Sequence, residues 1–168
     1  MSADVIKTVD FPPAYGADIV VSCEKAKDPK NGSIYLKPTQ FVLGIGCRRN
    51  TAFENIDRAI RQSLLKLQID ISDIDMIASI DVKKDEPGIK QFCDRNRIEF
   101  VTYTADELMA VQGEFSASQF VREHVGVDNV CERAAVLACS RECNEAGELI
   151  YKKHKYDRVT VAAAKYPD

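Results

Sequence analysis

Two glycines and two arginines share one short stretch of the chain, Gly44-Ile45-Gly46-Cys47-Arg48-Arg49-Asn50-Thr51. The apolar residues 41–43 enter this stretch and a helix start signal closes it, which predicts a buried strand that turns sharply into a helix. Such a turn presents backbone N–H groups and a helix N-terminus to solvent, and both favour an anionic ligand. Arg48 and Arg49 add two positive charges. The stretch predicts either an anion site or a tight turn whose arginines are only exposed.

Two common nucleotide-binding fingerprints are excluded here. The stretch lacks the third glycine of the G-x-G-x-x-G dinucleotide motif and the Gly-Lys-Ser/Thr of a P-loop. No nucleotide cofactor is therefore predicted.

A second charged group lies at the C-terminal end of the next predicted strand, residues 76–82. It contains Asp81, Lys83 and Glu86. Ligands of open α/β sheets bind outside the carboxyl ends of the strands, so the two turns share one crevice if their strands are parallel. A carboxylate there could act as a general base and the lysine as an electrostatic stabiliser. The alternative is a solvated loop in which Asp85 caps a helix.

The elements that position these residues alternate between strands and helices from Gln40 onwards. Capping boxes are predicted at 51–54 and 104–107, and apolar residues recur at helical spacing from Phe53 to Leu67. Further helices are predicted after Pro87, at 117–124 behind Ser116, and at 131–143, and further strands at 98–103, 148–154 and 158–164. Three βα units followed by a hairpin predict an α/β fold, a three-layer α/β/α sandwich with a mixed sheet.

The first 39 residues differ from the rest of the chain. Two short apolar runs, 18–22 and 33–37, flank a charged segment that contains the turn signal Asn31-Gly32. We interpret residues 1–39 as an edge hairpin, a linker or the tail of a preceding domain, and residues 40–168 as the α/β domain.

Composition excludes several classes of partner. The 168 residues carry a formal net charge of −3, which argues against nucleic-acid binding through bulk charge. No apolar run approaches the roughly 18 residues of a membrane span, and the first residues lack the apolar core of a signal peptide. A cytoplasmic location is therefore expected, with neither nucleic acid nor membrane as a partner.

The cysteines and histidines do not form a recognisable reactive site. Six scattered cysteines without a C-x-x-C pair predict reduced thiols. Cys139 and Cys143 share a helix face, but no histidine is near them in sequence, so core packing is favoured and no metal is predicted. His124 and His154 are expected at the surface, outside any nucleophilic triad. The basic hairpin is expected to be a solvated face; its residues are Lys152, Lys153, Lys155 and Arg158.

In their order along residues 40–165, these motifs resemble the C-terminal domain of the cobalamin-biosynthesis protein CbiG, and the stand-alone protein CobE is similar to the same domain. Asn50 stands where the family usually has glycine, and Asn tolerates a left-handed backbone. Arg133 stands where proline is common. The resemblance is carried by G-I-G-C-R-R with Thr51, Asp81-Val82-Lys83, Glu86-Pro87-Gly88, residues 118–121, Gly126-Val127, Val130-Cys131-Glu132, Ala134-Ala135, Lys155 and residues 159–162.

The resemblance implies a role in building the corrin ring of vitamin B12. CbiG acts on cobalt-precorrin-5A, opens a δ-lactone and releases acetaldehyde to give cobalt-precorrin-5B. Glu86 or Asp81 would then be the base and Lys83 the stabiliser of the oxyanion. The many carboxylates of the substrate would be bound at the first turn and at Ser118. The substrate-binding residues implied are Gly44, Gly46, Cys47, Arg48, Arg49, Thr51 and Ser118.

CbiG proteins are longer than this chain, with N-terminal and central regions before this domain. Residues 1–39 resemble the end of that central region, so the chain is expected to be a fragment whose partners include those regions. Two alternatives remain open at the level of sequence. One is a CobE-like module that binds or carries a corrin precursor without catalysis, and the other is an anion-binding α/β domain unrelated to cobalamin.

Overall fold

The computed structural model describes residues 19–21, 34–36, 41–116, 127–143 and 145–167. The chain divides into two compact units, Met1–Thr39 and Gln40–Asp168. In the first unit, β1 (Ile19–Val21) pairs with β2 (Ile34–Leu36) in a two-stranded sheet of their own. The pairing is parallel, so the hairpin interpretation is wrong.

A five-stranded mixed sheet forms the centre of the second unit. Its order is β5-β4-β3-β7-β6, with β3, β4 and β5 mutually parallel and β7 antiparallel to β3. β6 and β7 form the predicted hairpin and pair antiparallel, so β6 runs in the direction of β3. The bounds are β3 Phe41–Cys47, β4 Ile74–Ile80, β5 Glu99–Tyr103, β6 Glu148–Lys155 and β7 Val159–Lys165.

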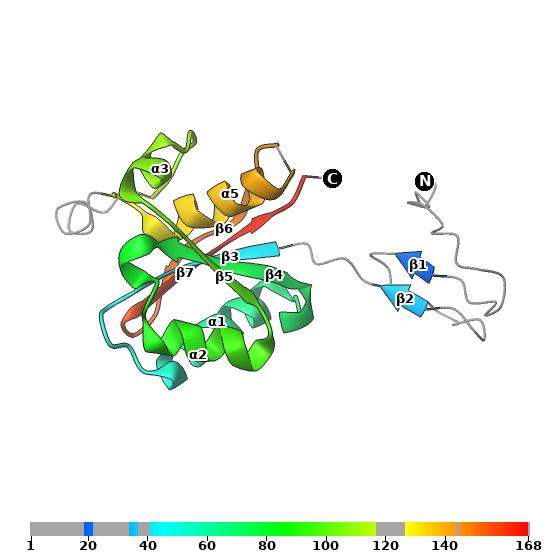
Figure 1. Ribbon diagram of the computed structural model, residues 1–168, viewed down its shortest axis with the longest axis horizontal. Helices are drawn as coiled ribbons and strands as arrows, with labels where there is room; N and C mark the ends of the chain where they lie inside the picture. The colour runs from blue at the N-terminus through cyan, green and yellow to red at the C-terminus, as the bar shows by residue number, and fades with distance from the viewer. Residues whose placement is uncertain (1–18, 22–33, 37–40, 117–126, 144, 168) are drawn as a thin grey trace. The chain divides into compact units, whose positions relative to one another are not determined.

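Helices cover both faces of this sheet. Figure 1 shows α1 and α2 on one side and α3 and α5 on the other, which confirms the predicted three-layer sandwich. The predicted helix at 117–124, with Ser118 and His124, lies outside the described residues. The bounds are α1 Phe53–Leu67, α2 Pro87–Asn96, α3 Ala105–Ala110 and α5 Val130–Cys143, with short 3-10 turns η1 at Ile71–Asp73 and η2 at Asp81–Lys83.

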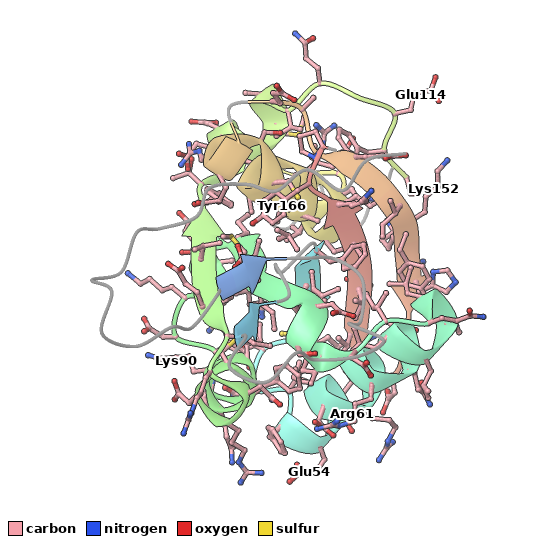
Figure 2. The ribbon with its side chains drawn as sticks, turned by 90° about the vertical axis from the view of Figure 1, so that its right-hand side faces the viewer. Glu54, Arg61, Lys90, Glu114, Lys152 and Tyr166 are labelled. Atoms are coloured by element: carbon pink, nitrogen blue, oxygen red, sulfur yellow. The ribbon has the colours of Figure 1, made fainter. Side chains whose placement is uncertain are left out.

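The alternation of side chains along β3 divides the interior into two cores. Leu43 and Ile45 face α1 and α2, whereas Val42 belongs to the core under α5. The apolar face predicted for α1 is confirmed, since Ile56 and Ile60 are fully buried. The opposite faces of α1 and α2 are mostly polar, although Leu65 of α1 is exposed, and Figure 2 shows Glu54 and Lys90 on their outer sides.

Only one of the two predicted capping boxes forms. At α3, Thr104 and Glu107 satisfy each other's backbone N–H groups, as predicted. At α1 the prediction is wrong, because the N-cap is Ala52 and no side chain caps the helix. The Thr51 hydroxyl instead donates to the Arg48 carbonyl at 2.6 Å, which closes the preceding turn. Sequence spacing could not reveal this competing acceptor.

Cys131 and Cys139 are packed in the core as predicted, whereas the side chain of Cys143 lies outside the described residues. Cys93, Cys131 and Cys139 are buried, and no cluster of possible metal ligands occurs within the described parts of the chain. Burial raises the pKa of Cys93 to about 12, and it has the same effect on Cys131. Both thiols therefore remain protonated at neutral pH.

Alkaline pH is expected to destabilise the fold through these thiols. An unfolded cysteine loses its proton near its ordinary pKa of 9.0, whereas the folded chain retains it up to about 12. Above pH 9 the unfolded state thus binds fewer protons, and the free energy of unfolding falls by about 1.4 kcal/mol per pH unit for each thiol. Urea unfolding between about pH 8 and pH 11 measures this slope. In the variant Cys93→Ala, the free energy of unfolding should fall less steeply with pH, by the contribution of one thiol. An unchanged slope would contradict the raised pKa of Cys93.

Candidate functional site

The two charged turns lie at the same edge of the sheet. Because β3 and β4 pair parallel, the end of β3 at Cys47 and the end of β4 at Ile80 point in one direction. The turn 48–52 leads from β3 into α1, and residues 81–86 lead from β4 into α2. This edge is where ligands of open α/β sheets bind.

Glu86 connects the two turns directly. Its side chain is 5 % exposed, and one carboxylate oxygen accepts the backbone N–H of Thr51 at 3.0 Å. The other oxygen accepts from Lys83 Nζ at 3.2 Å, in an ion pair that is itself largely buried. Glu86 is also the N-cap residue of α2, so the alternative in which Asp85 caps a helix is wrong.

The close approach of the two turns depends on Gly88. A Cβ atom on this residue would lie 2.3 Å from the Thr51 carbonyl oxygen, inside van der Waals contact. Beside this contact is an open hollow of about 290 Å³ at the starts of α1 and α2. It is lined by Asn50, Thr51, Ala52, Phe53, Pro87, Gly88 and Gln91. Two helix N-termini at one hollow favour a negatively charged ligand group.

The arginines of the first turn are free to meet a ligand. Arg48, Arg49 and Asn50 are exposed, and among the described residues neither arginine forms an ion pair. Asn50 adopts the left-handed backbone with φ of 57°, in agreement with its ability to replace a glycine.

Cys47 is half-buried at the end of β3, between the two turns. Burial raises the pKa of its thiol to about 11, although the positive charges of Lys83 and Arg158 act in the opposite direction. The thiol is therefore protonated at neutral pH and does not serve as a thiolate nucleophile.

The two glycines of the first motif are two residues apart on β3 and so share one face of the strand, where they allow close approach of α5 and of the Thr160 side chain. A Cβ on Gly44 would lie 1.7 Å from the backbone oxygen of Cys131 in α5, so α5 packs directly against the strand. A Cβ on Gly46 would lie 2.6 Å from the Thr160 hydroxyl, which donates to the Gly46 carbonyl. Gly44 is buried and positions α5, whereas Gly46 is half-buried near the ligand edge.

Of the two remaining predicted site residues, Asp81 lies among the described residues and Ser118 does not. Asp81 is half-buried in η2, and within the described parts of the chain its carboxylate has no hydrogen-bond or ion-pair partner. Ser118 is among the residues that the structure leaves undescribed.

Sequence reasoning missed Glu132, which is completely buried at the start of α5. Its carboxylate accepts from the Ser116 N–H and hydroxyl, both at 2.8 Å, and from the Lys153 N–H at 2.6 Å. Burial alone raises the pKa of Glu132, but these hydrogen bonds outweigh it and hold the pKa below the usual value. Glu132 is part of one motif of the family resemblance, and a local signal is Asn129 three residues earlier, whose side chain accepts the Glu132 N–H as a helix cap.

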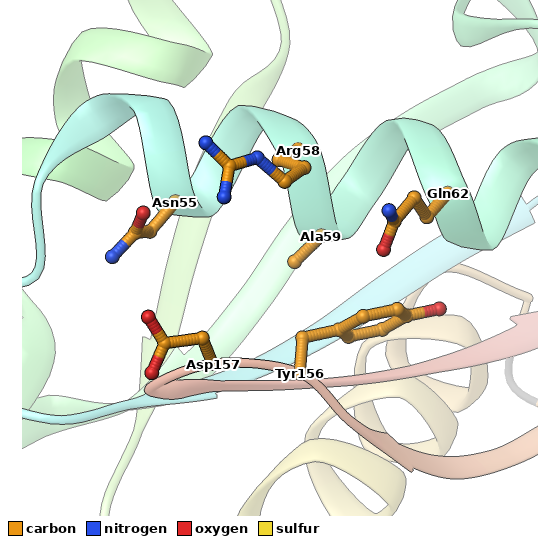
Figure 3. Close-up of a pocket in the computed structure, with 6 residues that line it drawn as sticks. All are labelled: Asn55, Arg58, Ala59, Gln62, Tyr156 and Asp157. Carbon is orange, nitrogen blue, oxygen red and sulfur yellow. The ribbon is translucent and has the colours of Figure 1, made fainter.

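The end of the β6–β7 hairpin reaches the same edge. The Arg48 N–H donates to the Arg158 carbonyl at 3.0 Å, so this basic segment adjoins the first turn. A pocket of about 60 Å³ separates the hairpin from α1, and Figure 3 shows Tyr156 and Asp157 facing Asn55 and Arg58 across it. The pocket has room for only a few water molecules, so a larger ligand must use the open hollow instead.

Comparison with known proteins identifies the family. Residues 41–164 match the family model described as "Cobalamin synthesis G C-terminus". The chain is 38% identical over 102 residues to the cobalt-precorrin-5A hydrolase of Salmonella typhimurium, a match that covers 61% of this chain and 29% of that protein. The corresponding enzyme of Priestia megaterium is 30% identical over 138 residues, or 82% of this chain and 35% of the relative. The chain thus spans less than half the length of these relatives.

A solved structure agrees with the sequence matches. The crystal structure of CobE, a protein from the cobalamin (vitamin B12) biosynthetic pathway, superimposes with a TM-score of 0.72 at 26% identity. The match covers 78% of this chain and 93% of CobE. With the family model spanning the whole α/β unit from β3 into β7, the chain belongs to the family of the C-terminal region of cobalamin-synthesis protein G.

Proposed function

We propose that this chain supplies the C-terminal part of a cobalt-precorrin-5A hydrolase in cobalamin biosynthesis. One observation carries the proposal most strongly: Glu86 joins two turns at the carboxyl edge of the sheet, beside two arginines that form no ion pair with any described residue. A corrin precursor bears many carboxylates, and arginine binds carboxylates through paired, charge-assisted hydrogen bonds. The hollow of about 290 Å³ suits one carboxylate-bearing arm, with the ring lying across the open edge.

The proposed reaction begins with water attacking the lactone carbonyl. A base takes the proton of the water, the acyl C–O bond breaks, and the ring opens to a carboxylate and an alcohol. Loss of the alcohol proton then forms the C=O bond of acetaldehyde as the C–C bond to the macrocycle breaks. The released electron pair remains on the macrocyclic carbon, which takes up a proton. The sum is one water consumed and one acetaldehyde released.

The two candidate carboxylates have different roles in this proposal. Both oxygens of Glu86 already accept hydrogen bonds, so this side chain positions Lys83 and the Thr51 N–H. Asp81 is the better candidate for the base because its carboxylate has no partner in the described structure. Lys83, held 14 % exposed beside Glu86, is the candidate to stabilise the oxyanion.

The curated relatives are more than twice as long as the matched segment, so we propose that the N-terminal and central regions of a CbiG-type protein act together with this domain in the cytoplasm. The second candidate function is that of a CobE-like corrin-binding module, favoured by the TM-score of 0.72. Within the described residues, no helix has the length and apolarity to span a membrane. Acetaldehyde release from cobalt-precorrin-5A, measured with and without those regions, distinguishes hydrolase from carrier.

The double variant Arg48→Ala with Arg49→Ala is expected to weaken binding of hydrogenobyrinic acid, a corrin polycarboxylate, at least tenfold. The reason is that each charge-assisted hydrogen bond to a carboxylate contributes about 1.5–3 kcal/mol. Titration of the visible absorption band of the corrin measures the dissociation constant.

The matched control removes two other surface arginines, Arg61 and Arg141, and thus changes the net charge equally. Both form exposed ion pairs elsewhere, with Asp57 and Glu107. This control should bind like the original chain. Equal affinity of all three proteins would contradict the arginine assignment, and no spectral change with the original chain would contradict the proposed function.

A further inference from the structure

We propose that Arg158, at the tip of the β6–β7 hairpin, is a third arginine of the polycarboxylate-binding edge. The inference rests on the proposed function for the identity of the natural ligand, and it assigns a binding role to a residue far from the first motif in sequence. From the sequence, this basic hairpin was expected to be a solvated face.

Backbone contacts fix the hairpin tip to the first turn. The Arg48 N–H donates to the Arg158 carbonyl at 3.0 Å, and the Arg158 guanidinium reaches the Arg49 carbonyl at 3.5 Å. Arg48, Arg49 and Arg158 are all exposed, so three guanidinium groups border one surface. Within the part of the chain that the structure describes, none of the three forms an ion pair with a carboxylate.

The positive charge of Arg158 also affects the electrostatics at Cys47, at the end of β3. Together with Lys83, it acts on the Cys47 thiol and opposes the rise in the pKa that burial causes. Lys83 is neutralised by Glu86 at 3.2 Å, whereas the Arg158 guanidinium retains its full charge for a ligand. The edge of the sheet therefore has an excess of positive charge, although the chain as a whole is acidic.

The backbone of Arg158 is in a conformation that arginine seldom adopts. Its φ is 61°, in a two-residue turn between Tyr156 and Val159 where glycine or asparagine would be favoured. Among the described non-glycine residues, positive φ occurs at Asn50, Gln68, Arg97 and Arg158. Gln68 and Arg97 end helices α1 and α2, a common place for this conformation. The other two, Asn50 and Arg158, lie in two turns at the ligand edge, where unfavourable backbone geometry often accompanies function.

Replacing Arg158 by glycine distinguishes an effect on the stability of the fold from an effect on ligand binding. Glycine adopts a φ of 61° without strain, so Arg158→Gly should keep or raise the midpoint temperature of unfolding. The same variant should weaken polycarboxylate binding at least fivefold, because it removes one guanidinium. Arg158→Lys, which retains the charge but not the paired hydrogen bonds, should be intermediate.

Arg97→Gly is a matched control within the same chain. Arg97 has a φ of 56° at the end of α2, next to the amino end of β5 and so at the opposite edge of the sheet. This variant loses the same charge and the same backbone strain. It should be as stable as Arg158→Gly but bind like the original chain.

Two ligands are used so that a failure of the Arg158 assignment can be distinguished from a failure of the proposed corrin function. Hydrogenobyrinic acid tests a corrin ligand, and benzenehexacarboxylate tests a polycarboxylate without a corrin, both at fixed ionic strength. Weaker binding of both probes by Arg158→Gly, but not by Arg97→Gly, supports the proposal. If the original chain binds only benzenehexacarboxylate and Arg158→Gly weakens it, the arginine site stands and the corrin assignment fails. Equal affinities of the two glycine variants, or no binding of either probe by the original chain, overturn the role of Arg158.

Discussion

Gly44→Ala is expected to lower the free energy of unfolding by about 3 kcal/mol or more, at or above the upper end of the usual range for overpacking. The added Cβ would lie 1.7 Å from the Cys131 carbonyl oxygen, and the next nearest atoms also belong to the backbone of α5. No side-chain rotation can relieve this contact, so α5 must move away from β3. Chemical denaturation monitored by circular dichroism measures the loss.

Gly46→Ala is the appropriate comparison because it lies two residues along the same strand. Its nearest neighbour would be the Thr160 hydroxyl at 2.6 Å, the end of a side chain that can rotate. We therefore expect a smaller loss, which the double variant Gly46→Ala with Thr160→Ala should partly restore. Equal destabilisation by Gly44→Ala and Gly46→Ala would contradict the direct packing of α5 on Gly44.

The second large effect is expected at Glu132. Glu132→Ala removes the acceptor of three part-buried donors, which are the Ser116 N–H, the Ser116 hydroxyl and the Lys153 N–H. At about 1 kcal/mol for each donor, the lower end of the range for unsatisfied buried groups, a total of about 3 kcal/mol is expected. Glu132→Gln keeps one acceptor oxygen but introduces N–H donors beside existing donors, and it should lie between Glu132→Ala and the original chain.

The stabilisation by Glu132 is also expected to depend on pH. Because hydrogen bonds hold the folded pKa of Glu132 below the ordinary glutamate value of 4.5, its stabilising contribution is present above that value. The contribution is lost as the pH falls through the folded pKa. The difference in unfolding free energy between the original chain and Glu132→Gln should therefore shrink below about pH 4.5.

Glu107→Ala is a natural control, since Glu107 occupies the third position of α3 as Glu132 does that of α5. Its carboxylate lies in an exposed capping box, so water can replace it at the backbone N–H of Thr104. A much smaller loss is expected. If Glu107→Ala and Glu132→Ala destabilise the fold equally, burial is not the cause of the effect.

Local patterns in the sequence predicted most elements of the second unit. The apolar face of α1 and the position of Pro87 at the start of α2 follow from helical spacing and from the missing N–H of proline. The capping box at Thr104 also formed as predicted, because its acceptors and donors are neighbours in the chain. The corresponding prediction at Thr51 failed because the Thr51 hydroxyl donates to the Arg48 carbonyl and because Glu86, 35 residues away, accepts the Thr51 N–H.

By itself, the sequence determined which residues carry charge and which turns end the strands, since both depend on residue type and short-range spacing. Only the tertiary structure decided how these groups meet. Parallel pairing of β3 with β4 placed Lys83 and Glu86 beside Thr51, and the β6–β7 hairpin placed Arg158 beside Arg48. Such contacts between distant residues arise from strand order and register, which are set by packing of the whole sheet and leave no local pattern.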